Sequence, residues 1–146
     1  MYIKNLEVLF HFFSVMIPSD GIMPDGSSVI RRSDLGDLLE ITHKYTRSLE
    51  AVCEFINKES ISLSNEGSVD LNDAHRIDIL RSMESAIPED FDMLIEVTYL
   101  LYYSKPEVHQ LIKWDTNELA EKNQLKPFDK SILNVIETRK PFWRQC

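Results

Sequence analysis

Apolar residues recur every three or four positions along most of this 146-residue chain, and this spacing limits the fold more than any other feature. The first such set lies within residues 1–17 and consists of Leu6, Leu9, Phe10, Phe13 and Ile17. We therefore expect an amphipathic helix that ends before Pro18, followed by a loop over residues 18–33. The nearest thing to a strand is a weak run over residues 97–102. The spacing predicts an all-α fold without a solenoid repeat.

The next helices follow from further stripes and their end signals. Asp34 or Ser33 can cap a stripe that extends across about 25 residues. Its members are Leu38, Leu39, Thr42, Tyr45, Leu49, Val52 and Ile56. Asp70 or Asn72 can start a third helix, with Ile77, Leu80 and Met83 facing inward. Pro88 suits the first position of a fourth, which we expect to end near Ser104. Short helical turns over 106–113 and 116–124 and a last helix over 129–139 complete a prediction of about five main helices in one compact domain, residues 1–146.

The charge distribution excludes one class of partner. Sixteen basic and 24 acidic residues give a net charge of −8, which argues against nucleic-acid binding because phosphate neutralisation needs a basic face. Residues 122–146 differ, with six basic residues against two acidic ones. This basic, aromatic C-terminal segment either folds onto its own domain or binds an acidic partner.

Targeting and redox signals are weak. The apolar run over residues 8–17 is half the length of a membrane span, contains His11 and lacks a cleavage site of small residues. We therefore expect no membrane insertion and no export signal, so the protein is cytoplasmic as written, or periplasmic if a partner carries it or a signal was trimmed. Cys53 and Cys146 could pair in an oxidising compartment, but we favour a buried Cys53 and a free terminal thiol.

Residues with catalytic or metal-binding chemistry do not form a set. Glu40 and His43 match the Glu-x-x-His pairing of di-metal bundles, but a second such pair is missing. We expect a surface pair whose alanine variants each change the stability by about 0–1 kcal/mol. The loop from Asp20 to Arg31 lacks the ligand pattern of a calcium loop. Glycine-rich phosphate loops and nucleophile motifs are absent. The sequence predicts a non-catalytic chain that carries no cofactor.

Aromatic residues are in excess near the C-terminal half and suggest a partner surface. Tyr99, Tyr102, Tyr103 and Trp114 fall within 16 residues, and Phe142, Trp143 and Arg144 lie almost at the end. Neighbouring Tyr102 and Tyr103 cannot point to the same side of a helix, so one should face inward and the other outward. Because Trp, Tyr and Arg dominate binding hot spots, the predicted partner-binding residues are Tyr102, Tyr103, Trp114, Phe142, Trp143 and Arg144. The alternative is that these rings fill a small helical core.

Several short sequence words occur in a recognisable order. Residues 17–20 read Ile-Pro-Ser-Asp, residues 98–108 read Thr-Tyr-Leu-Leu-Tyr-Tyr-Ser-Lys-Pro-Glu-Val, and Trp114 follows. Residues 127–133 read Pro-Phe-Asp-Lys-Ser-Ile-Leu, and residues 139–144 read Arg-Lys-Pro-Phe-Trp-Arg. In this order and spacing they resemble the gluconate 2-dehydrogenase subunit 3 family, whose members are small accessory subunits of membrane-associated flavoprotein dehydrogenases. The resemblance covers most of the chain.

The resemblance implies a small helical protein without catalytic residues of its own. Its partner would be a large FAD-containing dehydrogenase subunit of the glucose–methanol–choline type, acting on sugars or sugar acids, with a cytochrome c subunit often completing the complex. FAD is then expected on the partner, and no cofactor on this chain. The missing twin-arginine signal departs from the family's role in export. The alternative is a stand-alone helical interaction or regulatory protein, including a homodimer.

Overall fold

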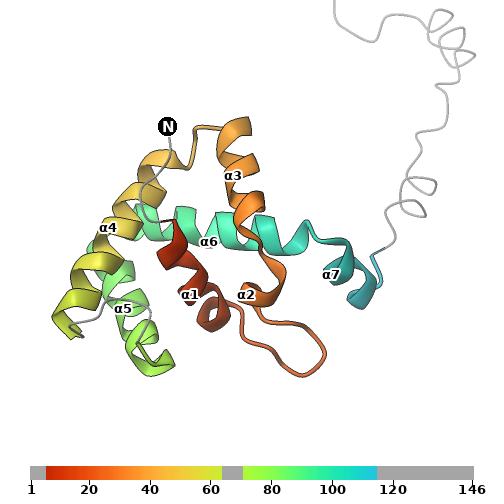
Figure 1. Ribbon diagram of the computed structural model, residues 1–146, viewed down its shortest axis with the longest axis horizontal. Helices are drawn as coiled ribbons and strands as arrows, with labels where there is room; N and C mark the ends of the chain where they lie inside the picture. Colours follow the sequence, from red (N-terminus) through yellow and green to blue (C-terminus); the bar gives the residue numbers. More distant parts are fainter. Residues whose placement is uncertain (1–5, 64–70, 115–146) are drawn as a thin grey trace, which may run out of the picture. The chain divides into compact units, whose positions relative to one another are not determined.

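The protein is mainly helical in the part described by its computed structural model, residues 6–63 and 71–114 (Figure 1). Seven helices cover 76% of these residues, and no strand occurs among them. In chain order they are α1 (Glu7–Met16), α2 (Gly26–Val29), α3 (Arg32–Ile41), α4 (Thr46–Leu63), α5 (Asp73–Ala86), α6 (Pro88–Tyr103) and α7 (Pro106–Leu111). The all-α prediction is confirmed. The described residues all belong to one unit, Met1–Trp114, and the prediction of one domain over 1–146 stays a prediction.

Several helix ends lie where the sequence predicts them. The Asn72 side chain accepts a hydrogen bond from the His75 N–H at 2.9 Å and so caps α5. Pro88 is the first residue of α6, where its missing N–H costs nothing, and Ser104 is the C-cap residue. The helical turn expected over 106–113 is α7. The turn expected over 116–124 and the helix expected over 129–139 lie outside the described residues.

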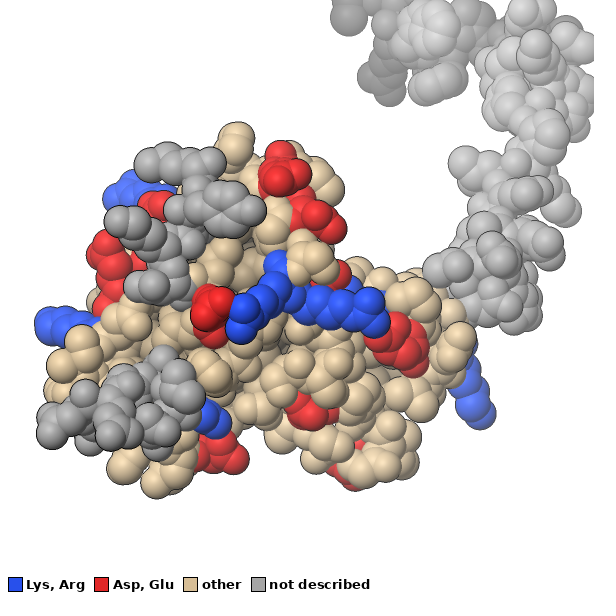
Figure 2. Space-filling model, in the orientation of Figure 1, with Lys and Arg blue, Asp and Glu red and all other residues tan. Residues whose placement is uncertain are grey.

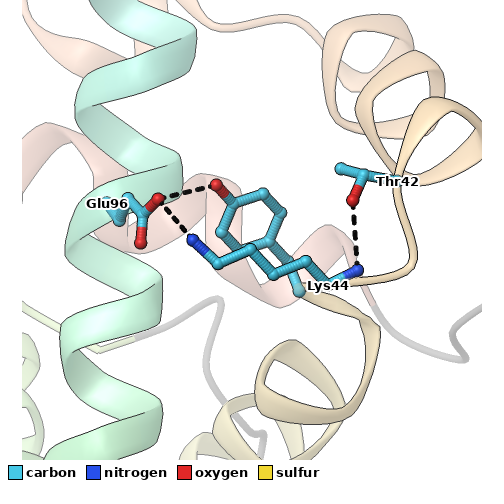
Figure 3. A network of polar contacts seen from close by, with 4 residues as sticks. Thr42, Lys44 and Glu96 are labelled. Carbon is cyan, nitrogen blue, oxygen red and sulfur yellow. Dashed lines mark hydrogen bonds and ion pairs between the residues drawn. The ribbon is translucent and has the colours of Figure 1, made fainter.

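The prediction of one continuous stripe from Leu38 to Ile56 is wrong, because the chain leaves the helical path between α3 and α4. Thr42 is extended, and its hydroxyl accepts a hydrogen bond from the Lys44 N–H at 3.3 Å (Figure 3). A threonine side chain that bonds to the nearby backbone competes with helix formation. The break is fastened to α6 by Glu96, whose Oε1 atom accepts hydrogen bonds from Lys44 Nζ and the Tyr45 hydroxyl, both at 2.8 Å.

Most of the core comes from α1, α4, α5 and α6, with smaller contributions from the other helices. Its largest fully buried side chains are Tyr102, Phe12, Phe13, Leu9, Ile30, Leu35, Leu49, Ile56, Ile79, Met83, Leu94 and Val52. Two inward faces differ from the predicted ones. In α5, Leu80 and Met83 are buried as predicted, but Ile77 is 38% exposed and Ile79 is buried. In α1 the buried residues are Val8, Leu9, Phe12 and Phe13, whereas Leu6, Phe10 and Ile17 lie at its margin.

The turn between α1 and α2 is held tightly, and we call residues 13–30 the α1–α2 joint. The Gly26 N–H donates to the Ile17 carbonyl at 2.8 Å and closes the loop. A β-carbon at Gly26 would lie 2.5 Å from the Phe13 carbonyl oxygen, so only glycine allows this approach. Within the loop, the Met23 and Ile22 N–H groups donate to Asp20 and lower the pKa of its carboxyl.

Tyr102 connects α6 to this joint. Its hydroxyl donates to the Pro24 carbonyl at 2.7 Å, and burial raises the pKa of Tyr102, as do the charges of Tyr103 and the nearby aspartates. The phenol therefore stays protonated and remains a donor at neutral pH. A second tie links α3 to the residue before α7, because Lys105 Nζ lies 2.5 Å from Asp34 Oδ2 and both side chains are mostly buried.

On the face drawn in Figure 2, basic side chains form a band across the middle with acidic side chains at its ends. Arg32 is paired with Glu7, which joins α3 to α1. Within residues 6–63 and 71–114, no helix is both long enough and apolar enough to cross a membrane.

Candidate interaction surface on helix α6

The second half of α6 carries more apolar residues than one buried face can hold. Residues 97–103 are seven consecutive residues without a charge, and seven residues make about two turns of an α-helix. The part of this run that faces the core is buried and comprises Val97, Thr98, Leu101 and Tyr102. The rest is about half exposed, at 48% for Tyr99, 47% for Leu100 and 48% for Tyr103. A helix that is apolar on nearly every side is typical of one that is covered by a partner.

Four of the partly covered residues are spaced four positions apart along the helix and form what we call the α6 stripe: Phe91, Ile95, Tyr99 and Tyr103. Residues four apart are neighbours on the surface of a helix. The Tyr99 and Tyr103 rings are stacked, with 6.1 Å between their centroids and 29° between their planes. Tyr103 also meets Tyr102 edge to face at 5.2 Å, so the exposed stack rests on the buried core.

A pocket of about 170 Å³ opens beside the stripe, between the end of α1, the middle of α5 and α6. Its lining residues are Met16, Ile17, Leu80, Phe91, Ile95, Thr98 and Tyr99. Two lining residues carry a hydroxyl, Thr98 and Tyr99. The Thr98 hydroxyl already donates a hydrogen bond to the Leu94 carbonyl at 2.7 Å. The wall therefore offers apolar contact and little hydrogen bonding. This volume is below the roughly 300–1,000 Å³ of small-molecule sites.

The apolar surface continues past the end of α6. His109 Nε2 lies 2.5 Å from the Tyr103 carbonyl oxygen, which fastens α7 to the last turn of α6. Helix α7 ends in a Schellman turn, since Trp114 N–H donates to the His109 carbonyl and Lys113 N–H to the Gln110 carbonyl. Lys113 occupies the left-handed position of this turn, with φ of 55°. Beside it lie three apolar side chains that are each more than 40% exposed, Leu111, Ile112 and Trp114.

Two acidic residues share helix faces with residues that line the pocket. Between Arg81 and Lys105 the sequence contains no lysine or arginine. Glu84 follows Leu80 by four residues on α5, and Asp92 precedes Ile95 by three on α6, so each carboxylate shares a helix face with a pocket residue. Both side chains are exposed, and within the described part of the chain neither forms a hydrogen bond or ion pair. Arg76 also shares a helix face with Leu80, but its side chain is mostly buried and paired with Asp73, so the exposed charges that these two faces add to the pocket are acidic.

The structure separates the predicted partner-binding residues. As the sequence predicts for adjacent tyrosines, Tyr102 faces inward and Tyr103 outward. Tyr102 is 1% exposed and hydrogen-bonded to the α1–α2 joint, so it lies beneath the exposed aromatic surface rather than on it. Tyr103 and Trp114 are exposed on α6 and after α7. Phe142, Trp143 and Arg144 lie outside the described residues.

The sequence reasoning missed Phe91 and Ile95 as members of a surface, and it did not single out Tyr99 for binding. The available signal was the uncharged run over residues 97–103, together with the four-residue spacing of the stripe. As a strand, most of this run gives only a weak signal. For a helix, the same run means that apolar side chains must also point away from the core.

Other candidate positions have simpler roles. Glu40 and His43 are both exposed, one in the last turn of α3 and the other in the break that follows. Among the described residues, no group of three or more His, Cys, Asp and Glu side chains could hold a metal ion. Cys53 is buried as predicted, and burial, with the charges of Glu50 and Glu54, raises the pKa of its thiol to about 12. Cys146 lies outside the described residues.

Comparison with known proteins adds no relative to this description. No family model matches the chain, and neither a curated protein nor a solved structure matches it.

Proposed function

We propose that this protein is a non-catalytic binding subunit whose contact surface is the α6 stripe with its neighbouring pocket. The observation that carries the proposal is the stacked pair Tyr99 and Tyr103, half exposed beside an apolar pocket on a helix whose other side is fully buried. Exposed aromatic clusters of this kind mark sites of protein association.

The sequence words suggest the partner. The word over residues 98–108 runs along the second half of α6 into α7 and includes both stacked tyrosines, and the word over residues 17–20 ends α1 and begins the loop of the α1–α2 joint. On this resemblance, the partner is a large FAD-dependent dehydrogenase subunit of the glucose–methanol–choline type that acts on sugars or sugar acids. The small subunit would stabilise and position it, and a cytochrome c subunit would complete the complex.

Co-expression tests this proposal directly. The chain is expressed with the flavoprotein of this type that is encoded nearest to its own gene, and only the small chain carries an affinity tag. We expect the flavoprotein to elute with the chain in a fixed ratio, and the chain alone to show neither flavin absorbance nor dehydrogenase activity. An isolated chain with stoichiometric flavin or metal contradicts the proposal, and so does the absence of co-elution when both proteins are soluble.

A homodimer is the alternative use of the same surface. Sedimentation velocity of the purified chain distinguishes the two, because an accessory subunit whose surface awaits a different protein should sediment as a monomer. A dimer that dissociates when Tyr103 is replaced by alanine would favour the alternative.

A further inference from the structure

We propose that the pocket between α1, α5 and α6 receives one apolar side chain of about the size of a benzene ring, presented by a basic segment of the large subunit. This inference rests on the proposed function and adds the chemistry of the contact. The occupant is a Leu, Met or Phe side chain with a Lys or Arg close to it.

The size of the pocket selects a single side chain. An apolar cavity of roughly 150 Å³ is large enough to bind benzene, and this pocket has about 170 Å³. A flavin or a sugar acid needs more space and several hydrogen-bonding groups. The wall offers Leu80, Phe91 and Ile95 instead, with Tyr99 at the edge, half exposed. Such a pocket matches the buried anchor of a protein interface, where a ring or branched side chain supplies most of the affinity.

The rim of the pocket selects the charge beside the anchor. Glu84 and Asp92 share helix faces with pocket residues and have no cationic partner among the described residues, and the nearest basic residues in sequence are Arg81 and Lys105. A lysine or arginine next to the anchor would approach these carboxylates as it enters. A second copy of this surface would bring the same two acids against each other, and like charges across an interface oppose binding. Charge complementarity therefore favours a basic segment of a different protein.

The first experiment tests the chemistry of the pocket on the full chain without the flavoprotein. Two probes of equal ring size are titrated, 2-phenylethylammonium and phenylacetate, and the methyl resonances of Ile95 and Thr98 are followed by NMR. We expect both methyl groups to shift, and the cation to bind about five-fold more tightly at low ionic strength, with the preference lost in about 1 M salt. The double variant Glu84→Gln, Asp92→Asn should remove the preference, whereas Asp37→Asn on α3 should keep it. Unshifted methyl groups, or equal binding of both probes, overturn the proposal.

The second experiment uses a matched pair of variants in the complex. Tyr99 and Leu100 are adjacent and equally exposed, but only Tyr99 lines the pocket. We expect Tyr99→Ala to weaken the binding of the flavoprotein at least about ten-fold, and Leu100→Ala to change it less than about two-fold. Ile95→Trp, which fills the pocket from inside, should also abolish binding. If this larger residue prevents folding, Tyr99→Ala still decides, because its side chain is half exposed. Equal effects of Tyr99→Ala and Leu100→Ala overturn the proposal.

The two experiments separate failure of this inference from failure of the proposed function. If the flavoprotein binds the wild-type chain and the Tyr99→Ala variant equally well, the accessory role stands and the pocket is not the contact. If the flavoprotein does not bind at all, the proposed function fails while the probes still report on the pocket. A dimer broken by Tyr99→Ala, or NMR cross-peaks from Ile95 to Phe142 or Trp143 in the isolated chain, would identify another occupant and overturn the proposal.

Discussion

The α1–α2 joint and the α6 stripe are both rich in apolar and aromatic residues, but these residues are buried in the joint and partly exposed on the stripe. In the joint, Phe13 is fully buried, the loop is closed by the Gly26 N–H, and the Tyr102 hydroxyl is tied to the Pro24 carbonyl. On the stripe, Tyr99 and Tyr103 are stacked on each other and half exposed. The chain thus completes its interior at the joint and leaves the stripe for an external contact. Of two adjacent residues, Tyr102 contacts the joint and Tyr103 belongs to the stripe.

The largest contrast is expected from truncating one ring in each region. Phe13→Ala should lower the free energy of unfolding by about 3–5 kcal/mol, because it removes a fully buried ring and leaves a cavity. Tyr103→Ala should lower it by about 1 kcal/mol or less, because its ring is half in water already. Urea denaturation of both variants measures the difference. Similar losses would mean that the stripe is part of the core.

Glycine positions give the next effect. Gly26→Ala should lower the free energy of unfolding by about 1–3 kcal/mol, because the new β-carbon meets the Phe13 carbonyl and α1 and α2 must separate. Gly36 lies within α3 and has no neighbouring atom within 4 Å of its would-be β-carbon. Gly36→Ala is therefore the control, and it should raise the stability by about 0.5–1 kcal/mol through helix propensity. Thermal melts that show the same sign for both variants would contradict the close approach at the joint.

The Asp34–Lys105 pair links the first turn of α3, next to the joint, to the end of α6. Burial alone would raise the pKa of Asp34, but the hydrogen bonds from Lys105 and from the Arg31 N–H outweigh it and hold the pKa below its usual value. A carboxyl with a lowered pKa stabilises the fold above its unfolded pKa of about 3.9, and this contribution is lost as the pH falls through the lower, folded value.

Asp34→Asn should therefore cost about 1–2 kcal/mol at pH 7, with the difference from wild type shrinking in acid below about pH 4. Urea denaturation across the pH range measures this difference. The exposed Asp37 on the same helix supplies the control, because Asp37→Asn should change the stability by no more than about 0.5 kcal/mol at any pH. A constant difference between wild type and Asp34→Asn down to pH 2 would contradict the role of the ion pair.

Removing one oxygen atom from each of the adjacent tyrosines sharpens the comparison further. Tyr102→Phe should lower the free energy of unfolding by about 0.5–1.5 kcal/mol, because the Pro24 carbonyl loses its donor. Tyr103→Phe should leave the stability unchanged, since Tyr103 is about half exposed. Thermal melts of the two variants measure this difference. An equal decrease in both melting temperatures would contradict a specific role for the Tyr102 hydroxyl.

The smallest expected effect is a gain at the far end of the apolar surface. Lys113 has a positive φ in the Schellman turn after α7, a conformation in which a side chain costs energy and glycine does not. Lys113→Gly should raise the free energy of unfolding by a few tenths of a kcal/mol up to about 1 kcal/mol. Lys113→Ala is the control for the lost charge and should bring no gain. A destabilised glycine variant would argue against this turn.

Helix ends that depend on nearby residues could be predicted from the sequence, whereas features that depend on distant residues could not. Asn72 and Pro88 act within their own turns, so the sequence was sufficient to place the starts of α5 and α6. The break after α3 could not be predicted in this way, because Lys44 and Tyr45 are held by Glu96, about 50 residues further along the chain. The candidate surface was predicted in part. The outward direction of one tyrosine follows from helical geometry, but which of the two turns inward depends on Pro24.

The buried position of Cys53 allows the rate at which the core opens to be measured. A thiol with its pKa raised to about 12 in a buried site contains almost no thiolate at neutral pH, so a thiol reagent cannot modify it while α4 is in place. Modification must wait for an opening that exposes this helix. In a Cys146→Ser background, the labelling rate of Cys53 would report how often such openings occur. A partner that binds the stripe and stabilises α6, the neighbour of α4, would lower the labelling rate of Cys53.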